Sequence, residues 1–106
     1  HAKTVIFMED KLLNTKEFEE LFQGILKLKN TKECKQFFRD LCTIAELEAM
    51  AERFQVAKKV SNQESYRDIC KQTGSSTATI TRVAHWLHHG MGGYGLVLKR
   101  LGVKRN

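Results

Sequence analysis

No proline occurs anywhere in the 106 residues of this chain, so no position lacks the backbone N–H that a helix interior requires. Strong helix formers such as Leu, Lys, Glu and Ala are abundant. No stretch alternates apolar and polar residues for long enough to indicate a sheet. With 42% apolar residues, the chain can bury one hydrophobic core but is too short for two domains. The sequence therefore predicts a single all-α domain.

Six helices joined by short turns are expected, over about residues 14–30, 31–41, 43–60, 65–74, 75–89 and 93–102. Each of the first five begins at a residue that can cap a helix N-terminus. These starts are Asn14 with Glu17, Thr31, Thr43 with Glu46, Ser65 with Asp68, and Ser75-Ser76. The two pairs Asn14/Glu17 and Thr43/Glu46 have the spacing of a capping box.

Residues 1–7 precede the first methionine, Met8, and we set them aside as a cloning remnant or an N-terminal extension. Residues 8–106 then form one helical domain. No apolar stretch approaches the ~20 residues of a membrane span, and no secretory leader is recognisable. The three cysteines, Cys34, Cys42 and Cys70, cannot all pair within the chain and are expected to be reduced. We expect a cytoplasmic protein without a membrane partner.

The net charge of +6 is unevenly distributed along the chain. Residues 1–57 carry nine basic and ten acidic side chains, whereas residues 58–106 carry nine basic side chains and only two acidic ones, Glu64 and Asp68. Such a basic segment attracts phosphate or another anionic surface. A basic face that merely keeps the protein in solution is the alternative, and charge alone does not separate the two.

Residues 65–89 have the spacing of a helix-turn-helix motif. Gly74 stands where the first helix must end in a left-handed conformation. Ile69 and Cys70 are expected on the inner face of the first helix, and Ile80 and Val83 on the inner face of the second. These residues can lock the two helices together and leave the rest of the second helix facing outwards.

The residues predicted to face outwards are small, hydroxylated or cationic, as a helix that enters the DNA major groove requires. They are Ser75, Ser76, Thr77, Ala78, Thr79, Thr81 and Arg82. No Asp or Glu, which would repel phosphate, occurs after Asp68. The alternative is an ordinary helical corner that begins with an ordinary serine cap.

The string Ala78-Thr79-Ile80-Thr81-Arg82 resembles the start of the recognition helix of the Trp repressor family. The similarity extends without a gap back to Thr43 and forward to Leu87, and it is greatest to the Trp-repressor-related branch of Gram-positive-type bacteria. The resemblance implies an intertwined, all-helical homodimer that presents two recognition helices to a near-palindromic operator. The half-sites would lie ~34 Å apart on double-stranded DNA.

The resemblance also assigns roles to individual residues. Arg67, Ala78, Thr79 and Thr81 match positions that the family uses at DNA. Cys70 occupies the position of a family lysine, so that contact is either missing or supplied by Lys71. Three further residues, Thr43, Arg53 and Arg82, match positions around the tryptophan corepressor pocket of the family.

Two residues depart from that pocket, because Val83 and Trp86 replace a glycine and a serine that accommodate the corepressor. We expect no cofactor and no L-tryptophan corepressor, although another small effector can bind. Trp86 can occupy or cover the pocket. Alternatively, it packs in the core or against a second chain.

Several other features are expected to be structural. His85, His88 and His89 lie near the end of the fifth helix without a neighbouring carboxylate or cysteine, so no metal site is predicted. The glycines at residues 90–95 are expected to form a flexible connector and not a phosphate-binding loop. No arrangement of catalytic groups is recognisable, so the chain is not expected to be an enzyme.

Aromatic residues are numerous in the first half of the chain, at Phe18, Phe22, Phe37, Phe38 and Phe54. The short helices of one chain could hardly cover them all, which favours an obligate dimer. Two functional classes remain. The first is a homodimeric, sequence-specific DNA-binding repressor; the second is a helical basic module that binds RNA or an acidic protein.

Overall fold

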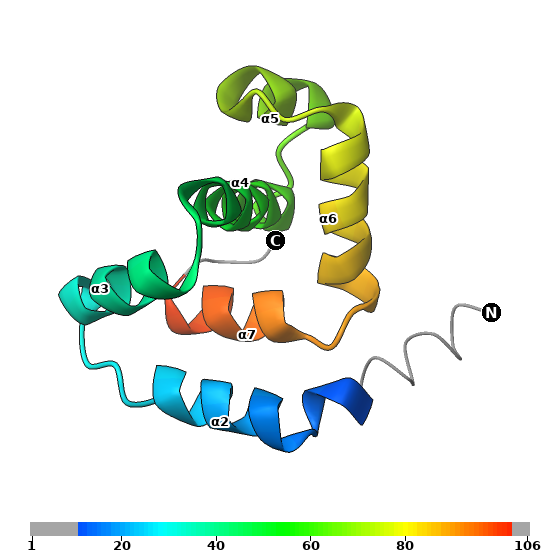
Figure 1. Cartoon of the computed structure of the whole chain (residues 1–106). Helices are drawn as coiled ribbons and strands as arrows, with labels where there is room; N and C mark the ends of the chain where they lie inside the picture. The colour runs from blue at the N-terminus through cyan, green and yellow to red at the C-terminus, as the bar shows by residue number, and fades with distance from the viewer. Residues whose placement is uncertain (1–10, 103–106) are drawn as a thin grey trace. The chain divides into compact units, whose positions relative to one another are not determined.

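The structure is a computed structural model that describes residues 11–102, in two compact units divided after Leu41. The first unit contains α2 (Lys16–Ile25) and α3 (Thr31–Leu41). The second contains α4 (Ile44–Ser61), α5 (Tyr66–Thr73), α6 (Thr77–His89) and α7 (Gly93–Arg100) (Figure 1). All six expected helices are present, residues 11–13 are also helical, and no residue from 11 to 102 forms a strand. Residues 1–7, which we set aside, lie outside this range.

Two of the expected helix starts are wrong by one residue. The N-cap of α2 is Thr15 and not Asn14, and its side chain makes no capping hydrogen bond. At α3 the side chain of Asn30 accepts a hydrogen bond from the backbone N–H of Glu33 at 2.9 Å, so Asn30 performs the capping expected of Thr31. Thr31 is already the first helical residue. The correction follows from geometry, because the Asn30 amide reaches the third N–H of the helix.

The N-terminal signals in the second unit are confirmed. Thr43 and Glu46 form a reciprocal capping box at α4, with hydrogen bonds of 3.1 and 2.8 Å. Ser65 caps α5 by accepting from the backbone N–H of Asp68, and Ser76 caps α6 by accepting from that of Thr79. Each cap satisfies a backbone donor that has no acceptor within its helix.

The second unit is built around α4, which contacts α5, α6 and α7. Figure 1 shows α4 almost end-on, with the other three helices around it. The core consists of fully or almost fully buried apolar side chains from α4, α5 and α6. These are Val56, Ala57, Ile69, Ile80 and Val83, with Val60, Cys70 and Tyr94 packed against them. The inner faces expected for the helix-turn-helix are thus confirmed.

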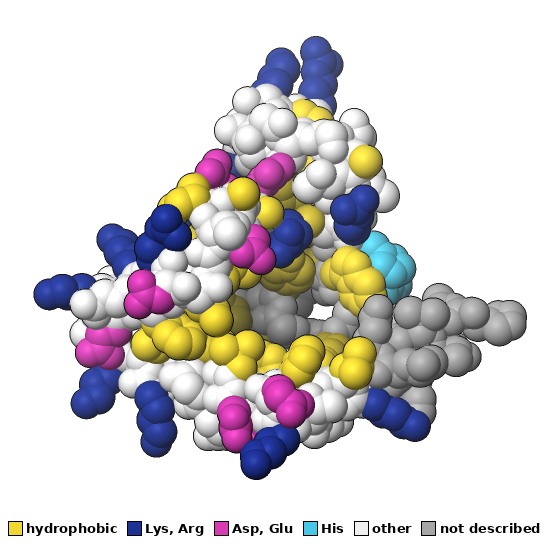
Figure 2. Space-filling model, viewed as in Figure 1, with side chains coloured by type: hydrophobic (Ala, Val, Ile, Leu, Met, Phe, Trp, Pro, Cys, Tyr) yellow, Lys and Arg dark blue, Asp and Glu magenta, His cyan; other side chains and the backbone are white. Residues whose placement is uncertain are grey.

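The first unit contrasts with this arrangement, since neither α2 nor α3 contains a buried residue. Phe18 and Phe22 of α2 are 39% and 41% exposed, and their rings contact each other edge to face with centroids 6.4 Å apart. Figure 2 shows apolar side chains along one edge of α2 and charged ones along the opposite edge. The helix is therefore amphipathic, and the first unit alone does not bury its apolar face.

The connection between α6 and α7, expected from the sequence to be a flexible connector, is a turn of three residues, Gly90, Met91 and Gly92. Gly92 is the N-cap of α7 and has a left-handed backbone conformation, with φ of 84°. At Gly90 a side chain has no room, because a Cβ atom would lie 2.5 Å from the backbone oxygen of Trp86. The turn therefore requires glycine at these two positions.

Candidate nucleic-acid interface

The turn between α5 and α6 is formed by three residues, Gly74, Ser75 and Ser76. Gly74 ends α5 in the left-handed conformation that the sequence predicted, with φ of 74°, and its N–H donates to the carbonyl oxygen of Cys70. Ser76 then caps α6, and its hydroxyl also donates to the Thr79 hydroxyl at 3.1 Å. Residues 65–89 therefore form a helix-turn-helix.

Seven of the nine residues predicted to contact DNA are exposed. They are Arg67 and Lys71 on α5, Ser76 in the turn, and Thr77, Ala78, Thr81 and Arg82 on α6. Figure 2 shows Lys and Arg side chains projecting from the region of α5. Thr79 is half-buried, and its hydroxyl accepts a hydrogen bond from that of Ser76. The structure thus places hydroxyl, methyl and cationic groups on adjacent surfaces of α5 and α6.

The prediction that Ser75 faces outwards is wrong. Its side chain is only 4% exposed, and its hydroxyl donates a hydrogen bond to the Glu52 carboxylate at 2.5 Å. The residue faces α4 because the turn directs it inwards, and a buried hydroxyl needs a partner. Glu52 was not recognised from the sequence, since it lies 23 residues from Ser75 and no local spacing relates the two.

Three of the four residues predicted around the ligand pocket lie together. Arg53, Arg82 and Trp86 line a hollow of about 400 Å³, together with Val83 and Tyr94. Two guanidinium groups in one hollow suit an anionic ligand group. Tyr94 was not recognised, because its place depends on how the Gly90–Gly92 turn directs α7 back towards α6.

Thr43, the fourth predicted residue, does not line this hollow. Its side chain caps α4, and the smaller hollow near it, of about 260 Å³, is lined by Cys42, Glu46, Ala49, Met50 and Arg53. The backbone N–H of Thr43 donates to the Glu46 carboxylate and, with the Thr43 side chain, holds the pKa of Glu46 below its ordinary value of 4.5. The role of Thr43 in the structure is therefore a helix cap.

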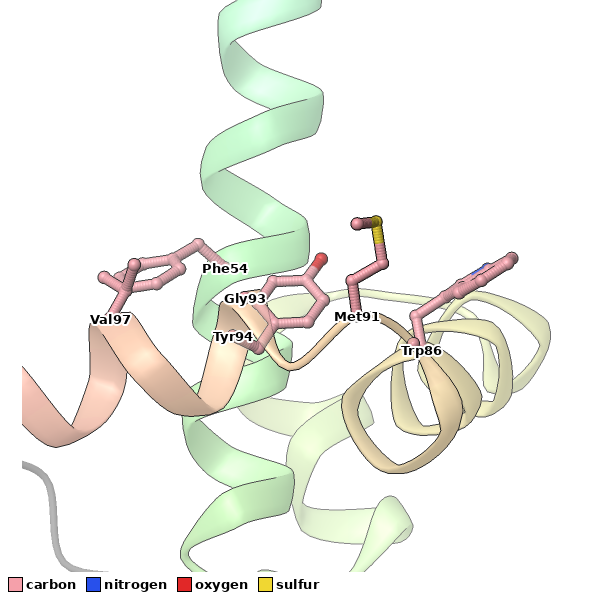
Figure 3. A pocket seen from close by; sticks show the side chains of 7 residues that line it. Phe54, Trp86, Met91, Gly93, Tyr94 and Val97 are labelled. Atoms are coloured by element: carbon pink, nitrogen blue, oxygen red, sulfur yellow. The ribbon is translucent and has the colours of Figure 1, made fainter. Parts of the chain in front are cut away.

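Trp86 borders a third, apolar hollow of about 450 Å³. Figure 3 shows Phe54 on α4, Tyr94 and Val97 on α7, Met91 in the connecting turn, and the indole of Trp86 directed away from Phe54. Trp86 is 42% exposed and lines both hollows. The interpretation of Trp86 as a core residue of one chain is therefore wrong, whereas its role at the pocket stays a prediction.

The histidines at the end of α6 are exposed. The rings of His85 and His89 lie 5.2 Å apart between centroids, and those of His88 and His89 lie 6.4 Å apart. Across residues 11–102, His, Cys, Asp and Glu nowhere gather in groups of three or more that could hold a metal ion. None of the helices in the same range is long and apolar enough to cross a membrane.

Comparisons with known proteins agree on one family. Residues 16–102 match the family model described as Trp repressor protein. The uncharacterized protein YerC of Bacillus subtilis (strain 168) is 43% identical over 94 residues, which cover 89% of this chain and 90% of YerC.

Two crystal structures have the same fold. A TrpR-like protein from Eubacterium eligens ATCC 27750 is 45% identical, with a TM-score of 0.85 over 91% of this chain and 99% of its own. A putative Trp repressor from Staphylococcus aureus is 41% identical, with a TM-score of 0.86 over 91% and 96% of the two chains.

The family resemblance noted from the Ala78–Arg82 string is thus confirmed over most of the chain. Members of this family are regulators and not enzymes, in agreement with the expectation from the sequence. The exposed first turn of α6 and the positive surface of α5 suit such a role. The chain belongs to the Trp repressor family of helix-turn-helix, DNA-binding transcription regulators.

Proposed function

We propose that the chain is a sequence-specific repressor that binds a near-palindromic operator in double-stranded DNA as a homodimer. The observation that carries this proposal is the exposed first half of α6, which presents Thr77, Ala78, Thr81 and Arg82 with no acidic residue nearby in the helix. Hydroxyls and methyl groups of this kind can contact base edges, and the arginine can pair with guanine. Because its target is genomic DNA, the protein acts in the bacterial cytoplasm.

The proposed contacts to the operator are of two kinds, those to phosphates and those to base edges. Arg67 and Lys71 lie one turn apart on α5, both exposed, and can neutralise phosphates. The N–H groups of Thr77 and Ala78, in the first turn of α6, have no intrahelical acceptors and can also bind a phosphate. Phosphate contacts set the orientation on the duplex, whereas Thr79 and Thr81 select the sequence.

The dimer is supported by the open apolar face of the first unit. Phe18, Leu21 and Phe22 of α2 and its C-cap residue, Leu26, are all at least 36% exposed. A second copy of the chain offers the matching apolar surface, since a symmetric interface is self-complementary. Two copies then present two α6 helices to half-sites ~34 Å apart.

Selection of bound sites from random duplexes tests the repressor proposal. We expect one recurring near-palindromic sequence, bound with an affinity that falls steeply as salt concentration rises. Thr79→Ala or Thr81→Ala should relax the sequence preference, whereas Lys71→Ala should weaken all sites alike. Absence of any sequence preference would contradict the proposal and favour the alternative, a basic module for RNA or an acidic protein.

We further propose that a small ligand other than L-tryptophan gates DNA binding from the hollow lined by Arg53, Arg82 and Trp86. The two arginines favour an anionic ligand, and Val83 with Trp86 leaves a different shape from that of the family pocket. Calorimetry with L-tryptophan should give no micromolar binding. If such binding occurs and strengthens DNA binding, the proposal is wrong.

Screening cell metabolites for those that change operator affinity should identify the effector. Arg53→Gln is the variant to compare, because Arg53 lines the hollow but lies on α4 and is not one of the proposed DNA contacts. The variant should lose the response to the effector and keep operator binding. Retention of the full response would place the ligand elsewhere.

A further inference from the structure

We infer that Glu52 of α4 is a positioning residue for the recognition helix α6 and that it acts through the buried hydroxyl of Ser75. The inference deepens the proposed function and rests on it, since the recognition of a DNA sequence is what the position of α6 would determine. Ser75 directly precedes the N-cap residue Ser76. A contact that holds Ser75 in place therefore also determines the position at which α6 begins.

A chain of three hydrogen bonds passes through the turn. The Thr73 hydroxyl donates to the carbonyl oxygen of Ile69 at 2.6 Å, and it accepts from the backbone N–H of Ser75 at 3.1 Å. The Ser75 hydroxyl donates to Oε2 of Glu52 at 2.5 Å. The turn is thus attached to the end of α5 on one side and to α4 on the other.

The face of α4 that meets the motif has a polar group at each end and an apolar residue between them. Glu52, Val56 and Lys59 are spaced i, i+4 and i+7, so they share one face. Val56 is completely buried, and the Lys59 ammonium donates to the Gln72 side chain at 2.5 Å while lying 3.8 Å from Glu64. The two polar contacts lie roughly 10 Å apart along α4, enough to fix α5 and the turn separately.

The contact joins a buried donor to an acceptor on the surface of α4, since Ser75 is buried and Glu52 is exposed. Ser75 is only 4% exposed, so without Glu52 its hydroxyl would lose its partner where water has little access. A carboxylate is also the stronger kind of acceptor, because hydrogen bonds to charged groups exceed those between neutral groups. The contact therefore favours one position of the turn over its neighbours.

The negative charge of Glu52 predicts different effects on specific and on non-specific DNA affinity. A carboxylate close to a DNA-binding turn repels phosphate and lowers affinity for any duplex. Removing the charge should therefore maintain or raise non-specific affinity, while loss of the fixed turn lowers specific affinity. A residue that served only overall stability would lower both affinities together.

The test compares two variants that break the contact in different ways. Glu52→Gln removes the charge and weakens the acceptor, whereas Ser75→Ala removes the donor and leaves the charge unchanged. Glu48→Gln is the matched control, because Glu48 is an exposed carboxylate on the same helix that makes no hydrogen bond to Gly74, Ser75 or Ser76. The affinity for the selected operator and for a scrambled duplex is measured with each full-length protein, below its unfolding temperature.

We expect the ratio of operator affinity to scrambled-duplex affinity to fall about tenfold in Glu52→Gln and in Ser75→Ala, the effect of losing one charged hydrogen bond. The double variant should fall no further than Ser75→Ala alone, since Ser75→Ala already removes the contact that Glu52→Gln weakens. The ratio for Glu48→Gln should stay within about twofold of the wild-type value. Amide hydrogen exchange should accelerate at Ser75 and Thr79 in both contact variants and stay unchanged at Val56.

The outcomes separate the two proposals. If the wild-type protein prefers no duplex, the proposed function fails, and the exchange measurement alone decides whether Glu52 fixes the turn. If the wild-type protein selects an operator and both contact variants keep its affinity ratio, the positioning role is wrong and the proposed function stands. An equal loss in Glu48→Gln would also overturn the inference, because the effect would then come from charge alone.

Discussion

The two units of the chain differ in how far they bury their apolar side chains. In the second unit Val56, Ile69 and Ile80 are completely buried, whereas α2 and α3 bury no side chain although both carry apolar residues at helical spacing. A helix in a folded protein gains most of its stability by burying its apolar face. The comparison indicates that the helix-turn-helix unit forms a core of its own, while the first unit needs another apolar surface.

The largest expected effect comes from charging the open face of α2. In the proposed homodimer Phe22 is covered by the second chain, so Phe22→Glu would bury an unpaired charge in each copy. We expect the dissociation constant of the dimer to rise roughly a hundredfold or more. Sedimentation equilibrium over a range of protein concentrations measures the change.

Gln23→Glu is the control for this prediction, because it adds the same charge at the next residue of α2, an exposed polar position. It should leave the dimer intact. If Phe22→Glu sediments as a dimer with wild-type affinity, the α2 face is not the interface, and the contrast between the two units needs another explanation.

The second prediction concerns the core of the helix-turn-helix unit. Ile80 of α6 is completely buried in the core that α4, α5 and α6 form. Ile80→Ala therefore removes packed carbon atoms and leaves a cavity. We expect a loss of about 3 kcal/mol in the free energy of unfolding, measured by urea denaturation. Leu96→Ala, at a position 50% exposed in α7, should cost well under half as much. Equal losses in the two variants would mean that the core does not lie where the structure places it.

These contrasts also explain which features the sequence could predict. Helices and inner faces depend on residues three or four positions apart, so Ile69, Ile80 and Val83 were identified as core from periodicity alone. The Ser75–Glu52 contact depends on the packing of α4 against the turn, which no local pattern encodes. Tyr94 reaches the arginine-lined hollow for a similar reason, because the turn before α7 determines its direction.

A pair of glycines gives a third prediction with opposite signs in the two units. Gly74 has a positive φ of 74°, a conformation that costs alanine about 1 kcal/mol, so Gly74→Ala should destabilise the protein by that amount. Gly24 is helical within α2, and a Cβ there would meet no atom within 4 Å. Gly24→Ala should therefore stabilise the protein by about 0.5 kcal/mol. Thermal unfolding measures both, and a shift of the same sign in both variants would contradict the prediction.

The smallest expected effect is a pH dependence at the start of α4, where the second unit begins. The backbone N–H and side chain of Thr43 hydrogen-bond the Glu46 carboxylate and lower its pKa below 4.5. A lowered pKa in the folded state means that this carboxylate stabilises the fold above the pKa it has when unfolded. The stabilisation is lost as the pH falls through the folded-state pKa. The difference in Tm between wild type and Glu46→Gln should therefore be present near pH 6 and vanish towards about pH 3.

Glu48→Gln is the control, because it removes a carboxylate outside the capping box, and its Tm difference from wild type should show no such pH dependence. If the Tm difference for Glu46→Gln stays constant across this pH range, the cap acts without the charge of Glu46.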